Sequence, residues 1–192
     1  MKPRLGIVIA STRVNRAGEP VAAWVIEKAR AHGGFEVEVL DLRAIALPML
    51  DEPNHPRLQN YTREETKAWS ATIAALDAFV FVTPEYNHSS PPALLNALDH
   101  LFFEWHYKPV GMVSYGGVSG GLRSVQMTKL TLAALKMVPI LEAVPLTFFA
   151  QLIDKASGAL VPGEANEKAA ALMLDELVRW QSALQVLRPA KP

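Results

Sequence analysis

The sequence predicts an α/β fold in which helices cover both faces of a parallel β-sheet. Two short apolar runs, at residues 5–10 and 78–82, are continuous rather than alternating, which is typical of strands buried on both faces. Strand-like and helical segments alternate five times along the 192 residues, and there is no internal repeat. Such alternation indicates βαβ units and therefore a three-layer sandwich of helix, sheet and helix.

The first two strands and the helix between them are expected within residues 5–41. After the run at 5–10, Pro20 suits the first turn of a helix, and apolar residues follow it at helical spacing. Gly33 and Gly34 form a typical helix end. Residues 35–41 alternate between apolar and polar side chains, so we expect a strand at the edge of the sheet with one solvated face.

The stretch from residue 43 to residue 61 predicts a long loop. It contains three prolines and little periodicity, and loops of this length are usually functional. The next helix is expected at 62–77, where Thr62 is a plausible N-cap and Glu65 stands at capping-box spacing.

The second half of the chain continues the alternation, with helices at about 91–103, up to 138 and 164–187, and strands at 110–114 and 143–149. Five βα units match the flavodoxin-like strand order 2-1-3-4-5. We expect a single domain over residues 1–192. In this order, ligands bind at the carboxyl ends of strands near the first and third strands, so the expected ligand loops are 10–19, 83–90 and 114–121.

Composition excludes several classes of function. Lys plus Arg and Asp plus Glu both number 19, and a chain without net charge lacks the basic footprint of a nucleic-acid-binding protein. There is no cysteine, which excludes disulfides, thiolate catalysis and cysteine-ligated metals. No apolar stretch reaches ~18 residues, so we expect no membrane span. Residues 1–4 lack signal-peptide features, and we expect a cytoplasmic protein.

The loop after the first strand favours an anion. It leads into a helix N-terminus, whose free N–H groups and dipole attract negative charge. Ser11 and Thr12 add hydroxyl donors, while Arg13 and Arg16 add guanidinium groups suited to phosphate. The alternative is a plain turn with solvated arginines.

The loop after the third strand favours a flat heterocycle. Its sequence, Pro84-Glu85-Tyr86-Asn87, is rigid, aromatic and rich in hydrogen-bonding groups. The alternative is a turn in which Asn87, Ser89 or Ser90 caps the next helix while Tyr86 packs on its neighbours.

The loop after the fourth strand holds four glycines, which allow close backbone approach to a ligand or serve turn geometry alone. Residues 117–121 also match the G-x-S-x-G nucleophile elbow, but all five histidines precede Ser119, so a hydrolase triad in the expected order is impossible. Neither a P-loop nor a Rossmann fingerprint is present. The histidine spacing fits no metal motif, and His100 and His106 are expected near a helix end.

Taken together, the three loops resemble those of the NAD(P)H-dependent FMN reductase family, which has a flavodoxin-like fold. The resemblance covers residues 4–150, and the segment Leu47-Pro48-x-x-Asp51-x-Pro53 also looks like the family. It implies a bound FMN whose phosphate is held by Ser11, Arg13, Asn15 and Arg16, with Thr12 beside them. It also implies an isoalloxazine site formed by Pro84, Glu85, Tyr86 and Asn87 on one side and by Ser114, Tyr115, Gly116 and Gly117 on the other.

Two positions depart from that pattern. Many relatives carry glycine where this chain has Ala10 and again where it has Asn15. Both positions lie in the phosphate loop, so they bear on the backbone dihedrals that this loop can adopt.

The resemblance implies hydride transfer from NADPH or NADH to FMN and on to a small acceptor, such as a quinone, an azo compound, free flavin or a metal oxyanion. The flavin carries this chemistry, so no catalytic side chain is expected. Family members are usually dimers or tetramers with the flavin near a subunit interface. Trp69, Trp105 and the 43–61 loop are candidates for that interface, and core packing is the alternative for each Trp.

Two other functions compete with this one. A flavodoxin-like electron carrier without NAD(P)H turnover is the first, but such carriers are acidic and have no arginine in the phosphate loop. This chain is neutral and has Arg13 and Arg16. A regulatory or binding protein that keeps the fold without turnover is the second.

Overall fold

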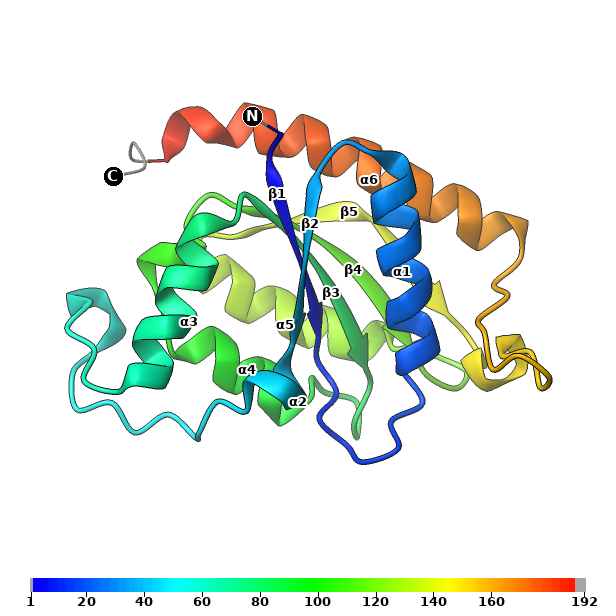
Figure 1. Ribbon diagram of the computed structural model, residues 1–192, viewed down its shortest axis with the longest axis horizontal. Coiled ribbons are helices and arrows are strands. Elements are labelled where there is room, and N and C mark those ends of the chain that lie inside the picture. Colours follow the sequence, from blue (N-terminus) through cyan, green and yellow to red (C-terminus); the bar gives the residue numbers. More distant parts are fainter. Residues whose placement is uncertain (1, 189–192) are drawn as a thin grey trace.

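The computed structural model describes residues 2–188, which form a five-stranded sheet with parallel pairing throughout. Its strands are β1 (Arg4–Ile9), β2 (Glu36–Asp41), β3 (Ala78–Pro84), β4 (Pro109–Tyr115) and β5 (Val138–Leu146). They lie in the order β2-β1-β3-β4-β5 (Figure 1). The predicted flavodoxin-like order is confirmed.

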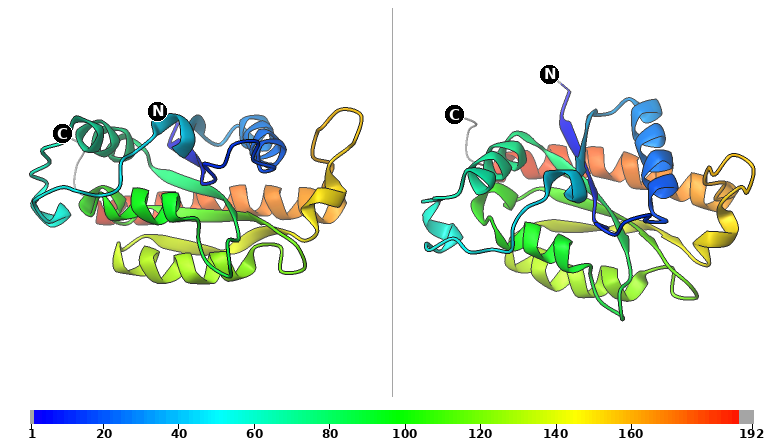
Figure 2. Two further views of the ribbon diagram at one scale, coloured as in Figure 1. Left: turned by 90° about the horizontal axis from the view of Figure 1, so that it is seen from below. Right: turned by 60° about the horizontal axis from the view of Figure 1, so that its bottom comes forward.

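Helices cover both faces of the sheet, as the alternation predicted (Figure 2). On one face, α1 (Glu19–His32) and α6 (Glu164–Leu184) pack against odd-numbered residues of β1 such as Leu5 and Ile7. On the other, α3 (Glu64–Ala75), α4 (Pro92–Asp99) and α5 (Leu122–Ala134) pack against residues such as Phe79 and Phe81. Short helical turns complete the chain: α2 (Leu42–Ile45), η1 (Pro56–Leu58), η2 (Phe103–Trp105), η3 (Phe149–Leu152) and η4 (Gln185–Leu187).

The centre of the sheet is buried and its two edges are partly exposed. Every residue of β3 and β4 is buried, which explains their continuous apolar sequences. Strand β2 is an edge strand, as predicted, but its two exposed residues, Glu36 and Val39, lie on opposite faces, so the expected single solvated face is not found. Helix α1 has proline in its first turn and ends at Gly33, whose φ of 72° is left-handed, as expected of a glycine helix end.

The opposite edge, β5, begins earlier than the sequence predicted, at Val138 rather than near residue 143. Pro139 and Pro145 lie within it. A proline cannot donate to the ladder and is tolerated mainly on edge strands, which is the place that β5 occupies. Pro139 therefore obscured the start of a strand whose later part the sequence predicted.

The start of α3 corrects a second prediction. Thr62 does not cap this helix, which begins at Glu64 with Arg63 at its N-cap position and without a side-chain cap of its own. The carboxylate of Glu52 accepts hydrogen bonds from the backbone N–H groups of Thr62 (2.8 Å) and Arg63 (2.9 Å) and from the Thr62 hydroxyl (2.8 Å). A residue from the preceding loop thus takes the role that the pattern assigned to Thr62 and Glu65.

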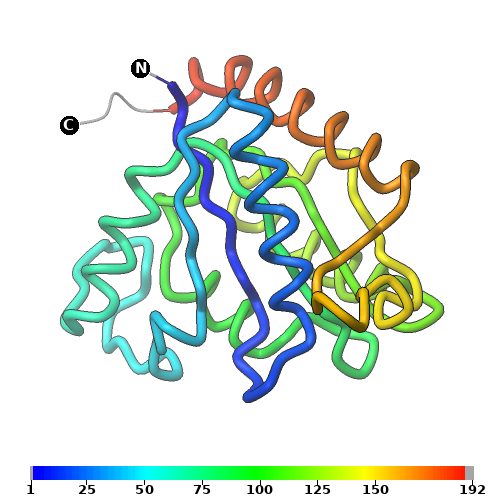
Figure 3. Tube along the Cα trace, turned by 45° about the vertical axis from the view of Figure 1, so that its right-hand side comes forward, coloured from blue at the N-terminus to red at the C-terminus, as the bar shows by residue number. Residues whose placement is uncertain are grey.

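The three expected ligand loops all lie at the carboxyl-terminal end of the parallel sheet, after β1, β3 and β4. In Figure 3 the loop after β1, in blue, and the loop after β3, in green, both lie at the lower end of the molecule, opposite the start of β1. Strand β3 continues two residues beyond the predicted end, to Pro84, so its loop begins at Glu85. The stretch 43–61 is not a plain loop, because α2 and η1 lie within it or at its border.

Candidate active site

A hollow of about 170 Å³ lies where the loops after β1, β3 and β4 converge. Its lining comes from all three loops and from the turn after β5: Ser11, Arg13, Arg16, Ala17, Pro84, Glu85, Tyr86, Tyr115, Gly116 and Phe149. A wider and more open hollow of about 730 Å³ adjoins it and shares Arg13, Glu85 and Tyr86. The site therefore lies at the switch point between β1 and β3, as the strand order requires.

The loop after β1 is shaped by residues that adopt special backbone conformations. Asn15 has a φ of 53°, in the left-handed region that glycine and asparagine tolerate best. This explains how Asn15 can stand where many relatives have glycine. Gly18 has an ordinary φ of −82°, but a Cβ built on it would lie 2.0 Å from the Tyr115 hydroxyl oxygen. A side chain at Gly18 is therefore excluded by contact rather than by backbone strain.

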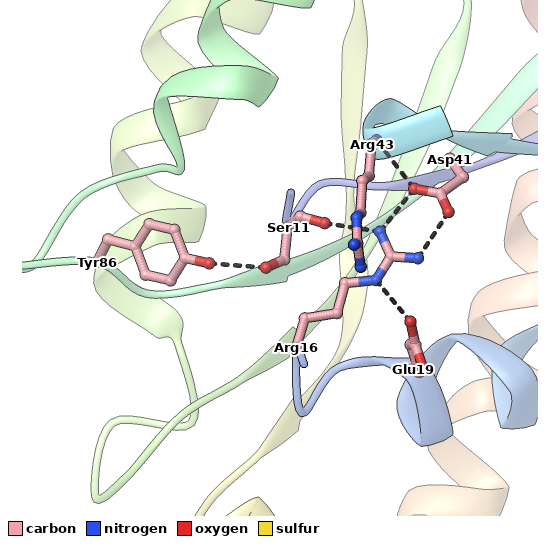
Figure 4. A network of polar contacts seen from close by, with 6 residues as sticks. All are labelled: Ser11, Arg16, Glu19, Asp41, Arg43 and Tyr86. Carbon is pink, nitrogen blue, oxygen red and sulfur yellow. Dashed lines mark hydrogen bonds and ion pairs between the residues drawn. The ribbon is translucent and has the colours of Figure 1, made fainter. Parts of the chain in front are cut away.

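Arg16 lies inside the loop rather than in solvent, so the alternative of a plain turn with solvated arginines is wrong for this residue (Figure 4). Its guanidinium donates two hydrogen bonds of 2.6 Å to the Asp41 carboxylate, one of 2.8 Å to the Ser11 carbonyl and one of 3.2 Å to Glu19. Its side chain is only 7% exposed. The hydrogen bonds with Asp41 raise the pKa of Arg16 and lower the pKa of Asp41. Arg16 thus ties the loop to the end of β2.

Arg13 contrasts with Arg16, because among residues 2–188 its side chain forms no hydrogen bond or ion pair. It is exposed and lines both hollows. A planar guanidinium in this state is suited to an anionic ligand.

Three hydroxyl groups gather where the small hollow meets the loop after β1. The Ser11 and Tyr86 hydroxyl oxygens lie 2.7 Å apart and share a hydrogen bond (Figure 4). The Tyr115 hydroxyl also interacts with Ser11. Burial raises the pKa of Tyr115, and the nearby Tyr86 phenol raises it further, so Tyr115 is neutral at physiological pH. The Tyr115 ring packs edge-on against Phe149, with centroids 5.0 Å apart.

The loop after β3 folds into a tight turn. Tyr86 and Ser89 exchange two backbone hydrogen bonds of 3.0 and 2.9 Å, and Asn87 and His88 between them have φ values of 50° and 66°. Two central residues with positive φ are the signature of a type I′ hairpin turn. Helix α4 has Pro91 at its N-cap and no side-chain cap, so the helix-cap alternative for Asn87, Ser89 or Ser90 is wrong.

Glu85 joins this loop to the loop after β4. Its carboxylate accepts hydrogen bonds from the Ser119 hydroxyl (2.8 Å), the Arg123 backbone N–H (3.1 Å) and the Arg123 guanidinium (2.8 Å). Burial raises the pKa of Glu85, but the hydrogen bonds from Arg123 and Ser119 lower it more, so the carboxyl is ionised at neutral pH. The serine of the apparent nucleophile elbow therefore bonds a carboxylate.

The remaining predicted site residues do not line the small hollow. Thr12 faces another hollow, of about 430 Å³, which it shares with α2, residues 46–49 and the start of α4. Asn87 lines the wide hollow only. The Ser114 hydroxyl donates to the Gly120 carbonyl at 2.7 Å and is buried, while the Gly117 carbonyl accepts from Gly120 and Phe148. Ser114 and Gly117 thus shape the loop and do not line the described hollows.

Sequence reasoning missed Ala17 and Phe149 in the small hollow and Leu95 in the wide one. Phe149 follows the fifth strand, whose end was misplaced, so no sequence signal placed it at the site. Trp69 and Trp105 are 3% and 1% exposed and their indole N–H groups donate to backbone carbonyls of Ala97 and Leu98. They belong to the core, so the interface alternative for them is wrong, whereas His100 and His106 do end short helices.

The chain is similar to known flavin reductases. A profile of the NADPH-dependent FMN reductase family matches residues 3–151. An NAD(P)H-dependent FMN reductase of Schizosaccharomyces pombe is 46% identical over 121 residues, which are 62% of this chain and 60% of that protein. One from a Nectria species is 33% identical over 173 residues, 86% of each chain.

A solved structure has the same fold. The flavoenzyme NAD(P)H:(acceptor) oxidoreductase of Paracoccus denitrificans superposes with a TM-score of 0.72 at 21% identity, over 94% of this chain and 98% of that one. None of the helices in the described part of the chain is long and apolar enough to cross a membrane. With the family profile covering most of the sequence, the conclusion is direct: the chain belongs to the NADPH-dependent FMN reductase family.

Proposed function

We propose that the protein is a flavin-dependent oxidoreductase that takes hydride from NADPH or NADH onto bound FMN and reduces a small acceptor: a quinone, an azo compound, free flavin or a metal oxyanion. One observation carries the proposal. The Arg13 guanidinium, which has no partner among the described residues, and two phenol rings line a single hollow at the switch point of the sheet, and α1 begins two residues after Ala17 in its lining. The guanidinium and the helix N-terminus suit a phosphate and the rings suit a flat heterocycle.

The residues of the hollow fit FMN at both of its ends. Ser11 and Arg13 offer O–H and N–H donors for the phosphate dianion, and the positive end of the α1 dipole follows two residues after Ala17. Pro84, Tyr86 and Gly116 offer a wall that is rigid, aromatic and open to close backbone approach. We propose that residues 1–192 form one FMN-binding domain on this basis.

FMN, when bound, supplies the acceptance and donation of hydride. The protein's own residues bind and orient. Arg13 balances the charge of the phosphate, and Arg16 keeps its loop in place through Asp41. Tyr86 and Tyr115 exclude water from the hollow, and their hydroxyls order Ser11 beside the phosphate position. No side-chain acid or base is required for hydride transfer to the flavin.

Two measurements on the purified protein test the proposal. The visible spectrum after incubation with FMN and removal of free flavin is expected to show a bound flavin. NADPH oxidation in the presence of a quinone is expected to depend on FMN. Absence of bound flavin after incubation with excess FMN would contradict the proposal.

The second candidate, an electron carrier, makes a different prediction. A carrier binds FMN but is not reduced by NADPH or NADH. Arg13 and the absence of net charge favour the reductase, as do the names of the relatives. Stopped-flow mixing with each nucleotide separates the two, and flavin that stays oxidised would favour a carrier or a regulatory protein.

We also propose that the protein forms a homodimer or homotetramer in the cytoplasm. Helices α4 and α5 and the turn η2 carry several exposed apolar side chains: Leu95, Phe103, Leu122, Met127 and Leu130. Leu95 also lines the wide hollow, so a partner covering these side chains would complete the wall of the site.

A further inference from the structure

One carboxylate connects the two loops that flank the proposed flavin site. Glu85, directly after β3, accepts from Ser119 and Arg123, which lie 34 and 38 residues further along the chain. The register of β3 with β4 ends at the pair Pro84 and Tyr115. Beyond that pair no ladder holds the loops together. The contacts of Glu85 are the next link, and at the far end of residues 85–90 the Ser90 hydroxyl bonds Thr128 and the Ser124 carbonyl of α5.

The link also completes the start of α5. This helix has Gly121 at its N-cap position, with a φ of 83° and no side-chain cap from its own loop. Glu85 supplies an acceptor for the Arg123 N–H from another loop, and a carboxylate is favoured at the positive end of a helix dipole. The Ser119 hydroxyl, besides donating to Glu85, accepts from the Gly121 N–H at 3.3 Å.

Because the Glu85 carboxylate is largely buried, its contacts with the loop after β4 depend on each of its hydrogen-bond donors. The Glu85 side chain is 10% exposed and lines both hollows, whereas the Arg123 side chain is 47% exposed. Loss of Arg123 or Ser119 would leave a largely buried carboxylate with fewer donors at the wall of the cleft. Such a charge favours loop rearrangement and opposes any gain of electrons by a neighbouring group.

On the basis of the flavin-dependent activity proposed above, we propose that Ser119 and Arg123 are positioning residues. Through Glu85 they fix the distance between residues 85–90 and residues 116–121. They also compensate the negative charge of Glu85 beside the flavin. This gives the G-x-S-x-G segment a role without nucleophilic chemistry. It also places two determinants of flavin binding and potential outside the residues that line the hollow.

The first test uses the full chain without added flavin. Hydrogen exchange is expected to accelerate in residues 85–90, as well as in 116–121, when Ser119 or Arg123 is replaced by alanine. Arg179→Ala is the matched control, because it removes an Arg–Glu pair from the remote helix α6. Unchanged exchange at 85–90 in both site variants would overturn the link, whether or not the protein proves to be a reductase.

The second test uses the FMN-loaded protein. Ser119→Ala and Arg123→Ala are expected to raise the FMN Kd about three- to tenfold. Ser119→Thr, which keeps the hydroxyl, is expected to restore it. Arg123→Ala is expected to shift the midpoint potential of bound FMN to more negative values, and Glu85→Gln to more positive values, which a purely structural role would not produce. Wild-type Kd and potential in Ser119→Ala and Arg123→Ala would refute the positioning role. A wild-type chain that binds no FMN would instead refute the proposed function.

Discussion

At the scale of single residues, the two arginines of the loop after β1 have different roles. Arg13 has no partner among the described residues, so Arg13→Ala is expected to weaken FMN binding by about 1.5–3 kcal/mol, the value of a hydrogen bond to a charged group. Fluorescence titration of FMN measures the change. Unfolding by urea without flavin is expected to be unaffected.

Arg16→Ala provides the matched comparison. It removes the partner of Asp41, so the flavin-free protein is expected to lose about 1–3 kcal/mol of unfolding free energy. If Arg13→Ala destabilised the flavin-free protein as much as Arg16→Ala, the division of roles between the two would be wrong.

Two glycines near the site differ in whether a larger residue would clash with its surroundings. Gly18→Ala places a Cβ against the Tyr115 hydroxyl, and we expect a loss of about 1–3 kcal/mol because the ring is buried and cannot move freely. Gly117→Ala is the control, since nothing lies within 4 Å of its Cβ position. Chemical denaturation of both variants is the measurement, and equal losses would contradict the contact at Gly18.

At the scale of the elements, the start of α3 depends on Glu52. Glu52→Ala is expected to cost about 1 kcal/mol, as loss of an N-cap does, whereas Glu65→Ala is expected to cost little. Burial raises the pKa of Glu52, but hydrogen bonds from Thr62 and Arg63 outweigh it and lower the pKa to about 2. The folded-state pKa thus lies below the unfolded value.

The stability that this cap contributes depends on pH, because the pKa of Glu52 is lower in the folded than in the unfolded state. The contribution of Glu52 is present above the ordinary glutamate pKa and is lost as the pH falls toward about 2. The stability difference between wild type and Glu52→Ala is therefore expected to shrink between about pH 4.5 and pH 2. A difference that stays constant over this range would show that the carboxylate is not the cap.

The hairpin turn after β3 offers a gain in stability. His88 adopts a φ of 66°, which costs a non-glycine residue about 1 kcal/mol, and Asn-Gly is the favoured pair for this turn. His88→Gly is expected to raise the unfolding free energy by up to about 1 kcal/mol, while His88→Ala leaves it nearly unchanged. Thermal and urea denaturation compare the two, and a less stable glycine variant would contradict the turn assignment.

At the scale of the whole molecule, the exposed apolar side chains of α4 and α5 predict self-association. Leu130 on α5 is 70% exposed, so Leu130→Glu is expected to shift the protein toward smaller species in sedimentation velocity. Leu172→Glu on α6, where the leucine is 53% exposed, is the control. Dissociation by the control alone would move the proposed interface to α6.

Local patterns predicted the strand order and the three loops that converge on the small hollow, because buried parallel strands and glycine-rich or proline-rich loops leave local signals. What failed depended on distant partners. The Asp41 partner of Arg16 lies 25 residues away at the end of β2, and the Glu52 cap lies 10 residues before Thr62. No local pattern reports such pairs. The start of β5 was missed for a related reason, because Pro139 and Pro145 are acceptable in this strand only through its place at the edge of the sheet.

Those two prolines have a consequence for how copies of the protein meet. Another chain can add a strand to an open sheet edge by pairing with its free backbone N–H and C=O groups. Proline has no backbone N–H, so it interrupts the row of donors that this pairing needs. At the other edge, β2 exposes the charged side chain of Glu36, which disfavours pairing with an identical strand. Growth of one continuous sheet through several molecules is therefore blocked at both ends, and ordered assembly is left to the helical faces.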